Sequence, residues 1–191
     1  CFGWCVVVRF VCVCCLCVWF GVCIGCVAMV YSPQQVLRLC THIHQAFSQG
    51  DRAQIRKLSE PLLHHLDLFR PAEVAMVLNH FAHLKVLEKE LWQPISSKLR
   101  MLFIDTDGKA LALAANAYAR ASVKHHGALE TLASWSKTVA LQNGLDARCA
   151  SMIVNSYSKL RIRDLELMDA LGEQLLRVVG DLNEIDIANV M

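Results

Sequence analysis

Asparagine and basic side chains recur along this chain at a spacing that could bind nucleic acid. Asn79, Asn116 and Asn155 lie 37 and 39 residues apart, and each precedes a His, Arg or Lys by four positions. Two of these asparagines also follow a Lys or Arg by seven positions. Amide groups can hydrogen-bond the edges of bases, and cations can hold phosphates. We therefore expect one RNA-binding row, made of Asn79, His83, Lys109, Asn116, Arg120, Arg148, Asn155 and Lys159.

The same pattern has a purely structural interpretation. Positions i, i+7 and i+11 share one face of a helix, so stacked helices would align these side chains whatever they bind. Asparagine is a poor helix former, and its place in mid-helix therefore needs a reason. It could hydrogen-bond a neighbouring helix or a backbone carbonyl, with the cations forming a solvated face. The spacing leaves both interpretations open.

The residues around each asparagine form a repeated helical phrase. It reads VAMVLNHFAHL, ALALAANAYAR and ASMIVNSYSKL, with a small residue four positions before the asparagine and Phe or Tyr two positions after it. Helical units of such a period stack into a solenoid, in which each unit covers the apolar face of the next. The chain is therefore predicted to be all-α: an α-solenoid of stacked helix-turn-helix repeats of about 37–39 residues.

We call the helix that carries the phrase the A helix and the helix after it the B helix. The A helices are expected near residues 33–47, 71–86, 108–123 and 147–160, with B helices between them. Asp107 and Asp146 are placed to cap two A helices, and the aromatic residues fall on the apolar stripe. We expect burial of Val77, Leu78, Phe81, Leu113, Tyr118, Ile153 and Tyr157.

Weaker copies extend the array in both directions. Residues 32–43 align with residues 70–81, but Thr41 replaces the asparagine. At the other end Ala188 takes the place of the small residue, so the next asparagine would fall at position 192. The sequence thus predicts an array over residues 31–191 that is truncated at its C-terminus, as in a fragment of a longer protein.

Residues 1–30 differ in composition from the rest. They hold eight of the ten cysteines, and the stretch from Phe10 to Tyr31 has no charge and is long enough to cross a bilayer. Nearly all of them are residue types whose codons need only T and G, and the chain starts with Cys1. The segment is either a membrane segment or translated noncoding sequence. In the second case a chain starting near Met29 should fold equally well.

Charge is distributed unevenly over the remaining residues. From Tyr31 onward 18 Lys and Arg face 17 Asp and Glu, so net charge alone does not predict a nucleic-acid partner. Residues 108–124 and 147–163, however, carry cations and no acid, whereas residues 164–186 carry seven acids. The two layers of the solenoid are therefore expected to differ in charge.

Motifs for enzymatic chemistry are absent from the sequence. It has no phosphate-binding glycine loop, no GxSxG and no HExxH. His80 and His83 could present two imidazoles on one helix face, but no nearby carboxylate or cysteine completes a zinc set. Cys40 and Cys149 are isolated, as expected of buried thiols in a reducing compartment. We therefore expect a non-enzyme without cofactor or metal.

The segments VLNHFAHL, AANAYARA and IVNSYSKL resemble helical repeats of organellar proteins. These are the heptatricopeptide and octotricopeptide families and the related arrays beside RAP domains, and the resemblance covers about residues 32–191. It implies an α-solenoid in mitochondria, or alternatively in plastids, that binds single-stranded or ribosomal RNA. Such proteins act in transcript stability or processing, or in the mitochondrial ribosome. No RAP domain is visible in the sequence.

Two functions follow as hypotheses. One is an organellar RNA-binding solenoid, and the other is a non-catalytic scaffold that binds organellar ribosomal or other proteins. The placement of charge distinguishes them. A-helix cations that converge on a concave surface favour RNA, whereas cations that scatter or pair with acids of the B layer favour a scaffold.

Overall fold

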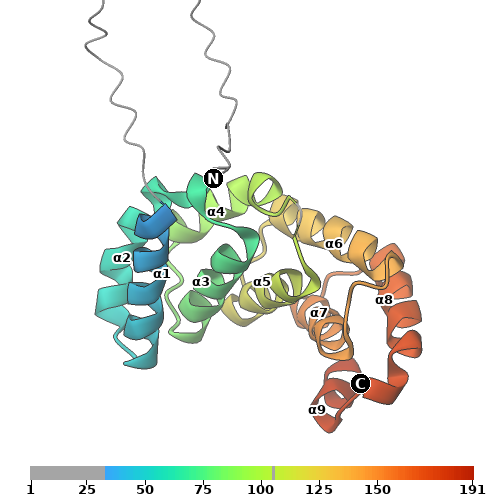
Figure 1. The fold of residues 1–191 in the computed structure, drawn as a ribbon. Helices are drawn as coiled ribbons and strands as arrows, with labels where there is room; N and C mark the ends of the chain where they lie inside the picture. The colour runs from blue at the N-terminus through green and yellow to red at the C-terminus, as the bar shows by residue number, and fades with distance from the viewer. Residues whose placement is uncertain (1–32, 105) are drawn as a thin grey trace, which may run out of the picture. The chain divides into compact units, whose positions relative to one another are not determined.

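The computed structural model describes residues 33–104 and 106–191, and these residues form helices and no strand (Figure 1). The A helices are α1 (Pro33–Ser48), α3 (Pro71–His83), α5 (Gly108–Ala121), α7 (Ala147–Leu160) and α9 (Glu184–Val190). The B helices are α2 (Arg52–His64), α4 (Lys89–Leu102), α6 (His126–Leu141) and α8 (Leu165–Arg177). Short 3-10 turns lie at Leu66–Leu68 and Val179–Asp181.

The described residues form one compact unit built of two rows of helices. Each A helix packs on the next A helix, from α1 through α3, α5 and α7 to α9, and each B helix from α2 to α8 packs on the next B helix. Figure 1 shows α4, α6 and α8 following one another on one side and α3, α5, α7 and α9 on the other. The predicted all-α helical-repeat fold is confirmed.

Side-chain caps start the A helices where the sequence predicts. The Asp107 carboxylate accepts a hydrogen bond from the backbone N–H of Ala110 at 2.7 Å, and Asp146 accepts one from Cys149 at 2.6 Å. These contacts satisfy backbone donors that the first helical turn leaves without a partner. Proline occupies the first turn of α3, where its missing N–H costs nothing.

The A helices end in one recurring motif. Lys85, Ser122 and Arg161 follow α3, α5 and α7 with φ of 55°, 56° and 57°. The next residue then bonds back five positions, from Val86 to the Phe81 carbonyl at 2.9 Å and likewise after α5 and α7. This motif ends α3 and α5 earlier than predicted. Glycine is the usual sequence signal of the motif, and because it is absent there, the sequence did not indicate these ends.

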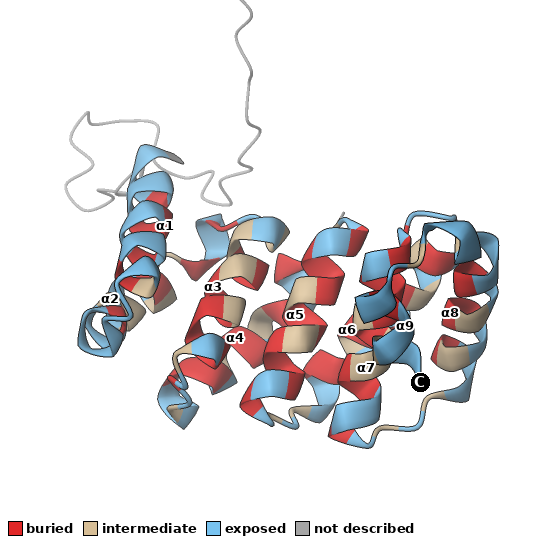
Figure 2. Ribbon diagram, turned by 90° about the horizontal axis from the view of Figure 1, so that it is seen from below, coloured by how far each residue is buried: buried red, intermediate tan, exposed pale blue. Residues whose placement is uncertain are grey.

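The core lies between the rows and between neighbouring A helices. Figure 2 shows buried residues along α3, α5 and α7, and α5 is rich in alanine, which lets neighbouring helices approach closely. Two aromatic side chains join the rows by hydrogen bonds. The Tyr118 hydroxyl lies 2.7 Å from the Ser96 hydroxyl on α4, and the Tyr157 hydroxyl donates to the Leu129 carbonyl on α6 at 2.7 Å.

Six of the seven residues predicted to be buried are at most 1 % exposed, and Leu113 is the exception. Leu113 is half-buried because it lies three residues before Asn116, on the open face of the A row rather than between helices. The expectation for residues 1–30, including the membrane interpretation, falls outside the described residues. None of the described helices has the length and apolar character needed to span a bilayer.

Candidate nucleic-acid interface

A groove of about 400 Å³ opens on the A row, between α3, α5, α7 and the start of α9. Seven of the eight residues predicted from sequence line it: Asn79, His83, Asn116, Arg120, Arg148, Asn155 and Lys159. The asparagines are half-buried, whereas His83 and the three cations are exposed. We call this feature the A-row groove. The structure therefore brings residues from three repeats into one place, as equivalent positions on stacked helices require.

Lys109 is the predicted residue that the structure leaves out of the groove. It lies exposed in the first turn of α5, among the charges that act on the Cys149 thiol of α7. Arg148, its counterpart on α7, does line the groove, because Asn183 and Ile185 at the start of α9 provide an opposite wall there. The groove therefore includes the first turn of α7 but not the first turn of α5.

The groove also contains residues that the sequence pattern missed. They are Leu113, Met152, Asn183, Ile185, Asp186 and Asn189. The asparagine that continues the row is Asn189, 34 residues after Asn155, rather than a residue at position 192. The last repeat is shorter than the others, and Asn183 and Asp186 form a capping box that starts α9. An asparagine followed three residues later by an acid was the sequence signal that could have located this start.

Asparagine side chains bond neighbouring A helices in pairs. The Asn116 amide donates to the Asn79 amide oxygen at 3.4 Å, and the Asn155 amide donates to Asn189 at 2.6 Å. The structural interpretation of the asparagines therefore holds in part. Each amide offers two donors and an acceptor oxygen with two lone pairs, and each of these bonds uses one group of each partner. The other groups can serve a ligand in the groove.

His83 orients Arg120 across the α3–α5 contact. The guanidinium of Arg120 lies 3.2 Å from His83 Nδ1, and because a guanidinium only donates, this nitrogen must be the unprotonated acceptor. Burial and, secondly, the Arg120 charge lower the pKa of His83. At neutral pH His83 is thus a positioning residue for a cation and adds no charge of its own.

Cations in the groove differ from those of the B row in their partners. Within the described ranges, no ion pair involves Arg120, Arg148 or Lys159. Several cations on B helices, in contrast, pair with acids: Lys98 with Asp67 at 2.8 Å, Lys137 with Glu166 at 2.5 Å and Arg177 with Glu173 at 3.2 Å. The groove cations are therefore available to an anionic ligand.

The acidic residue that lines the groove, Asp186, is buried and hydrogen-bonded within the protein. Asp186 is 2 % exposed, and its carboxylate accepts hydrogen bonds from the Ser151 hydroxyl at 3.1 Å and from the backbone N–H of Asn183 at 3.3 Å. These hydrogen bonds hold the buried carboxylate between α7 and the start of α9. The solvent-exposed charge of the groove is therefore positive.

A histidine cluster closes the α1 end of the A row. His44 Nδ1 lies 3.2 Å from His80 Nε2, and the Phe47 ring stacks on His80 with centroids 4.0 Å apart. Among the residues that the structure describes, no three His, Cys, Asp or Glu side chains gather as a metal site. Burial raises the pKa of the Cys40 and Cys149 thiols to about 11 and about 12, so neither is a reactive thiolate at neutral pH.

A model of a known protein family matches most of the chain. The family model of the RNA-editing substrate-binding complex 6 protein matches residues 26–191. No curated protein shows significant similarity to the chain. The match confirms a helical family concerned with RNA processing, but it does not support the heptatricopeptide or octotricopeptide repeat type in particular. Because the match covers most of the sequence, the chain belongs to the RNA-editing substrate-binding complex 6 protein family.

Proposed function

We propose that this chain is a non-catalytic component of an RNA-editing substrate-binding complex, and that it binds single-stranded RNA in the A-row groove. The observation that carries the proposal is the separation of charge. Arg120, Arg148 and Lys159 have no acidic partner in the described ranges, whereas Lys98, Lys137 and Arg177 of the B row are paired. Exposed cations without acidic partners can bind phosphates of RNA. This binding releases the counterions that surround the RNA, and the release favours the complex.

The groove suits single strands rather than duplexes. Its amides can reach base edges only where bases are unpaired, because the deep major groove of an RNA duplex hides them from side chains. Leu113 and Met152 are half-buried in the groove and offer apolar surface for a base. The arrangement therefore combines phosphate contacts with base contacts, as binding of single-stranded RNA requires.

Replacing Arg120 and Lys159 by Ala should weaken binding to every single-stranded RNA. Each lost phosphate contact should reduce the slope of log affinity against log salt by about 0.7. Filter binding at several salt concentrations measures both effects. The matched control is Lys98→Ala with Arg100→Ala, which removes one Lys and one Arg from α4 and should leave the slope unchanged. Equal affinity in the groove variant and the wild type would reject the RNA groove.

Replacing Asn116 or Asn155 by Ala should change which sequences bind best more than it changes the salt slope. An amide that contacts a base edge contributes about 1–3 kcal/mol of discrimination but no counterion release. Competition among homopolymer RNAs measures this preference. Gln93→Ala, which removes an exposed amide from α4, is the control. An unchanged ranking of the RNAs would assign the asparagines to helix packing alone.

A protein-binding scaffold is the second candidate function. Met101, Leu141 and Leu176, all near the C-terminal ends of B helices, are 71 %, 60 % and 75 % exposed. Large apolar side chains in solvent are typical of protein-binding surfaces where they gather.

A mitochondrial location, with plastids as the alternative, rests on the resemblance of the repeats to organellar proteins. Fluorescence imaging of the tagged full chain tests that location.

A further inference from the structure

We infer that the loops after α3 and α7 carry a second row of phosphate contacts, formed by Lys85 and Arg161, which continues the A-row groove along its edge. The inference rests on the proposed RNA-binding function and extends it to residues outside the groove. Its ligand is the phosphate backbone of the same single-stranded RNA. Three observations support it: backbone conformation, position relative to the groove, and the absence of acidic partners.

Backbone conformation gives the first argument. One or two residues after each of the first four A helices the backbone has positive φ, and after α1 this residue is Gly50 with φ of 67°. Glycine adopts this conformation freely, but a residue with a side chain is strained in it. Lys85 and Arg161 nevertheless occupy it, at 55° and 57°. A strained position filled by a long cation indicates that its side chain has a use.

Position relative to the groove gives the second argument. Lys85 follows the groove residue His83 by two positions, and Arg161 follows the groove residue Lys159 by two. The same offset after Arg120 leads to Ser122 on α5. Because the three A helices end in the same motif, these loops extend the row of groove cations at their C-terminal ends.

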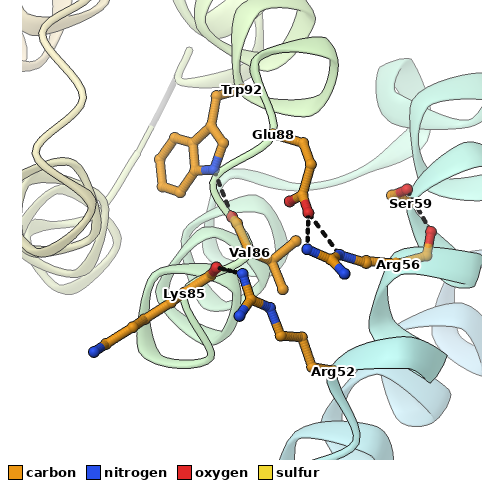
Figure 3. A network of polar contacts seen from close by, with 7 residues as sticks. All are labelled: Arg52, Arg56, Ser59, Lys85, Val86, Glu88 and Trp92. Carbon is orange, nitrogen blue, oxygen red and sulfur yellow. Dashed lines mark hydrogen bonds and ion pairs between the residues drawn. The ribbon is translucent and has the colours of Figure 1, made fainter.

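The contacts around Lys85 give the third argument. Arg52 of α2 donates to the Lys85 carbonyl, and Arg56 pairs with Glu88 at 2.5 Å, so both arginines hold the α3–α4 loop (Figure 3). Figure 3 also shows the Lys85 side chain extending away from this network. In the part of the chain that the structure describes, neither Lys85 nor Arg161 has a carboxylate partner. The loop is fixed while its cation is left for a ligand.

Substitution by glycine tests the inference, because it separates binding from stability. Lys85→Gly with Arg161→Gly should leave Tm equal or higher, since glycine relieves the strain. The same variant should weaken binding to a homopolymer RNA and lower the salt slope by about 1.4, for two phosphate contacts. Ser122→Gly is the matched control: it relieves strain at the equivalent position without removing charge, and its RNA affinity should equal that of the wild type.

Each outcome of this comparison decides a point. If the glycine variant keeps the full salt slope while Arg120→Ala with Lys159→Ala loses part of it, the inference is wrong and the groove stands. If only the glycine variant loses slope, the loops bind RNA and the groove does not. Lower Tm with unchanged RNA binding would mean that the cations serve only the helix ends. A wild-type chain that binds no RNA overturns both proposals. Should the glycine variant fail to fold, Lys85→Gln with Arg161→Gln removes the charges at constant φ.

Discussion

Acidification from pH 6.5 to pH 4 should cost this protein about 3 kcal/mol of unfolding free energy through His80 alone. Burial, followed by the nearby His44 and His83, lowers the pKa of His80 to about 4. The unfolded chain therefore takes up the proton at higher pH than the folded chain does. The contribution of His80 is fully present above its ordinary pKa of about 6.5 and is lost as the pH falls towards 4.

The surroundings of His80 explain this sensitivity. The residue is 6 % exposed, its Nδ1 is buried without a hydrogen-bond partner, and Phe47 covers one face of the ring. A charged imidazole in this place would lose its hydration without gaining an acid. Urea unfolding at pH 6.5 and pH 4 measures the effect in the wild type and in His80→Gln. The variant should show a smaller drop, whereas His42→Gln, at an exposed site on α1, should behave as the wild type. Equal drops in all three proteins would exclude His80 as the source.

Replacing Tyr157 by Ala should lower the free energy of unfolding by about 3–5 kcal/mol. The side chain is 1 % exposed and its hydroxyl bonds the Leu129 carbonyl, so the substitution removes both packing and a contact between the rows. Tyr157→Phe removes only the hydrogen bond and should cost about 1 kcal/mol. Urea titration followed by circular dichroism measures both variants.

Leu165→Ala serves as the control for the tyrosine substitutions. Its side chain is 76 % exposed, so the change should stay within about 0.5 kcal/mol. A loss below about 1 kcal/mol in Tyr157→Ala would mean that Tyr157 does not join the rows. Repeat arrays can unfold in segments, so two spectroscopic probes should be compared before one free energy is assigned.

The sequence predicted the parts of this fold that repeat. Equivalent residues on stacked helices occupy equivalent places, so the asparagine spacing located α3, α5 and α7 and aligned seven groove residues. It failed where one repeat departs from the others. The shortened last repeat placed Asn189 beside Asn155, and a fixed period could not reveal this.

Side-chain surroundings were also beyond the sequence pattern. Leu113 belongs to the apolar stripe by spacing, yet it faces the groove, because the width of a helix contact depends on the neighbour as well as on the helix itself. Lys85 and Arg161 showed no helix-stop signal, since their residue types do not favour positive φ. His83 looked like a cation, and only its distance to Arg120 shows that it acts as an acceptor.

The helices from α3 to α9 pack mainly on their counterparts in neighbouring repeats, and this packing has a mechanical consequence. Small rotations at each of these contacts add up along the row. The helical array should therefore be elastic and bend at low force while every helix stays intact. The amide pairs join A helices, and the ion pairs join segments of the B row, so the two sets lie on opposite sides of the array. Bending therefore stretches one set while it compresses the other. A ligand that contacts several A helices would fix the array at one curvature. Its affinity would therefore depend on tension applied to the two ends of the array.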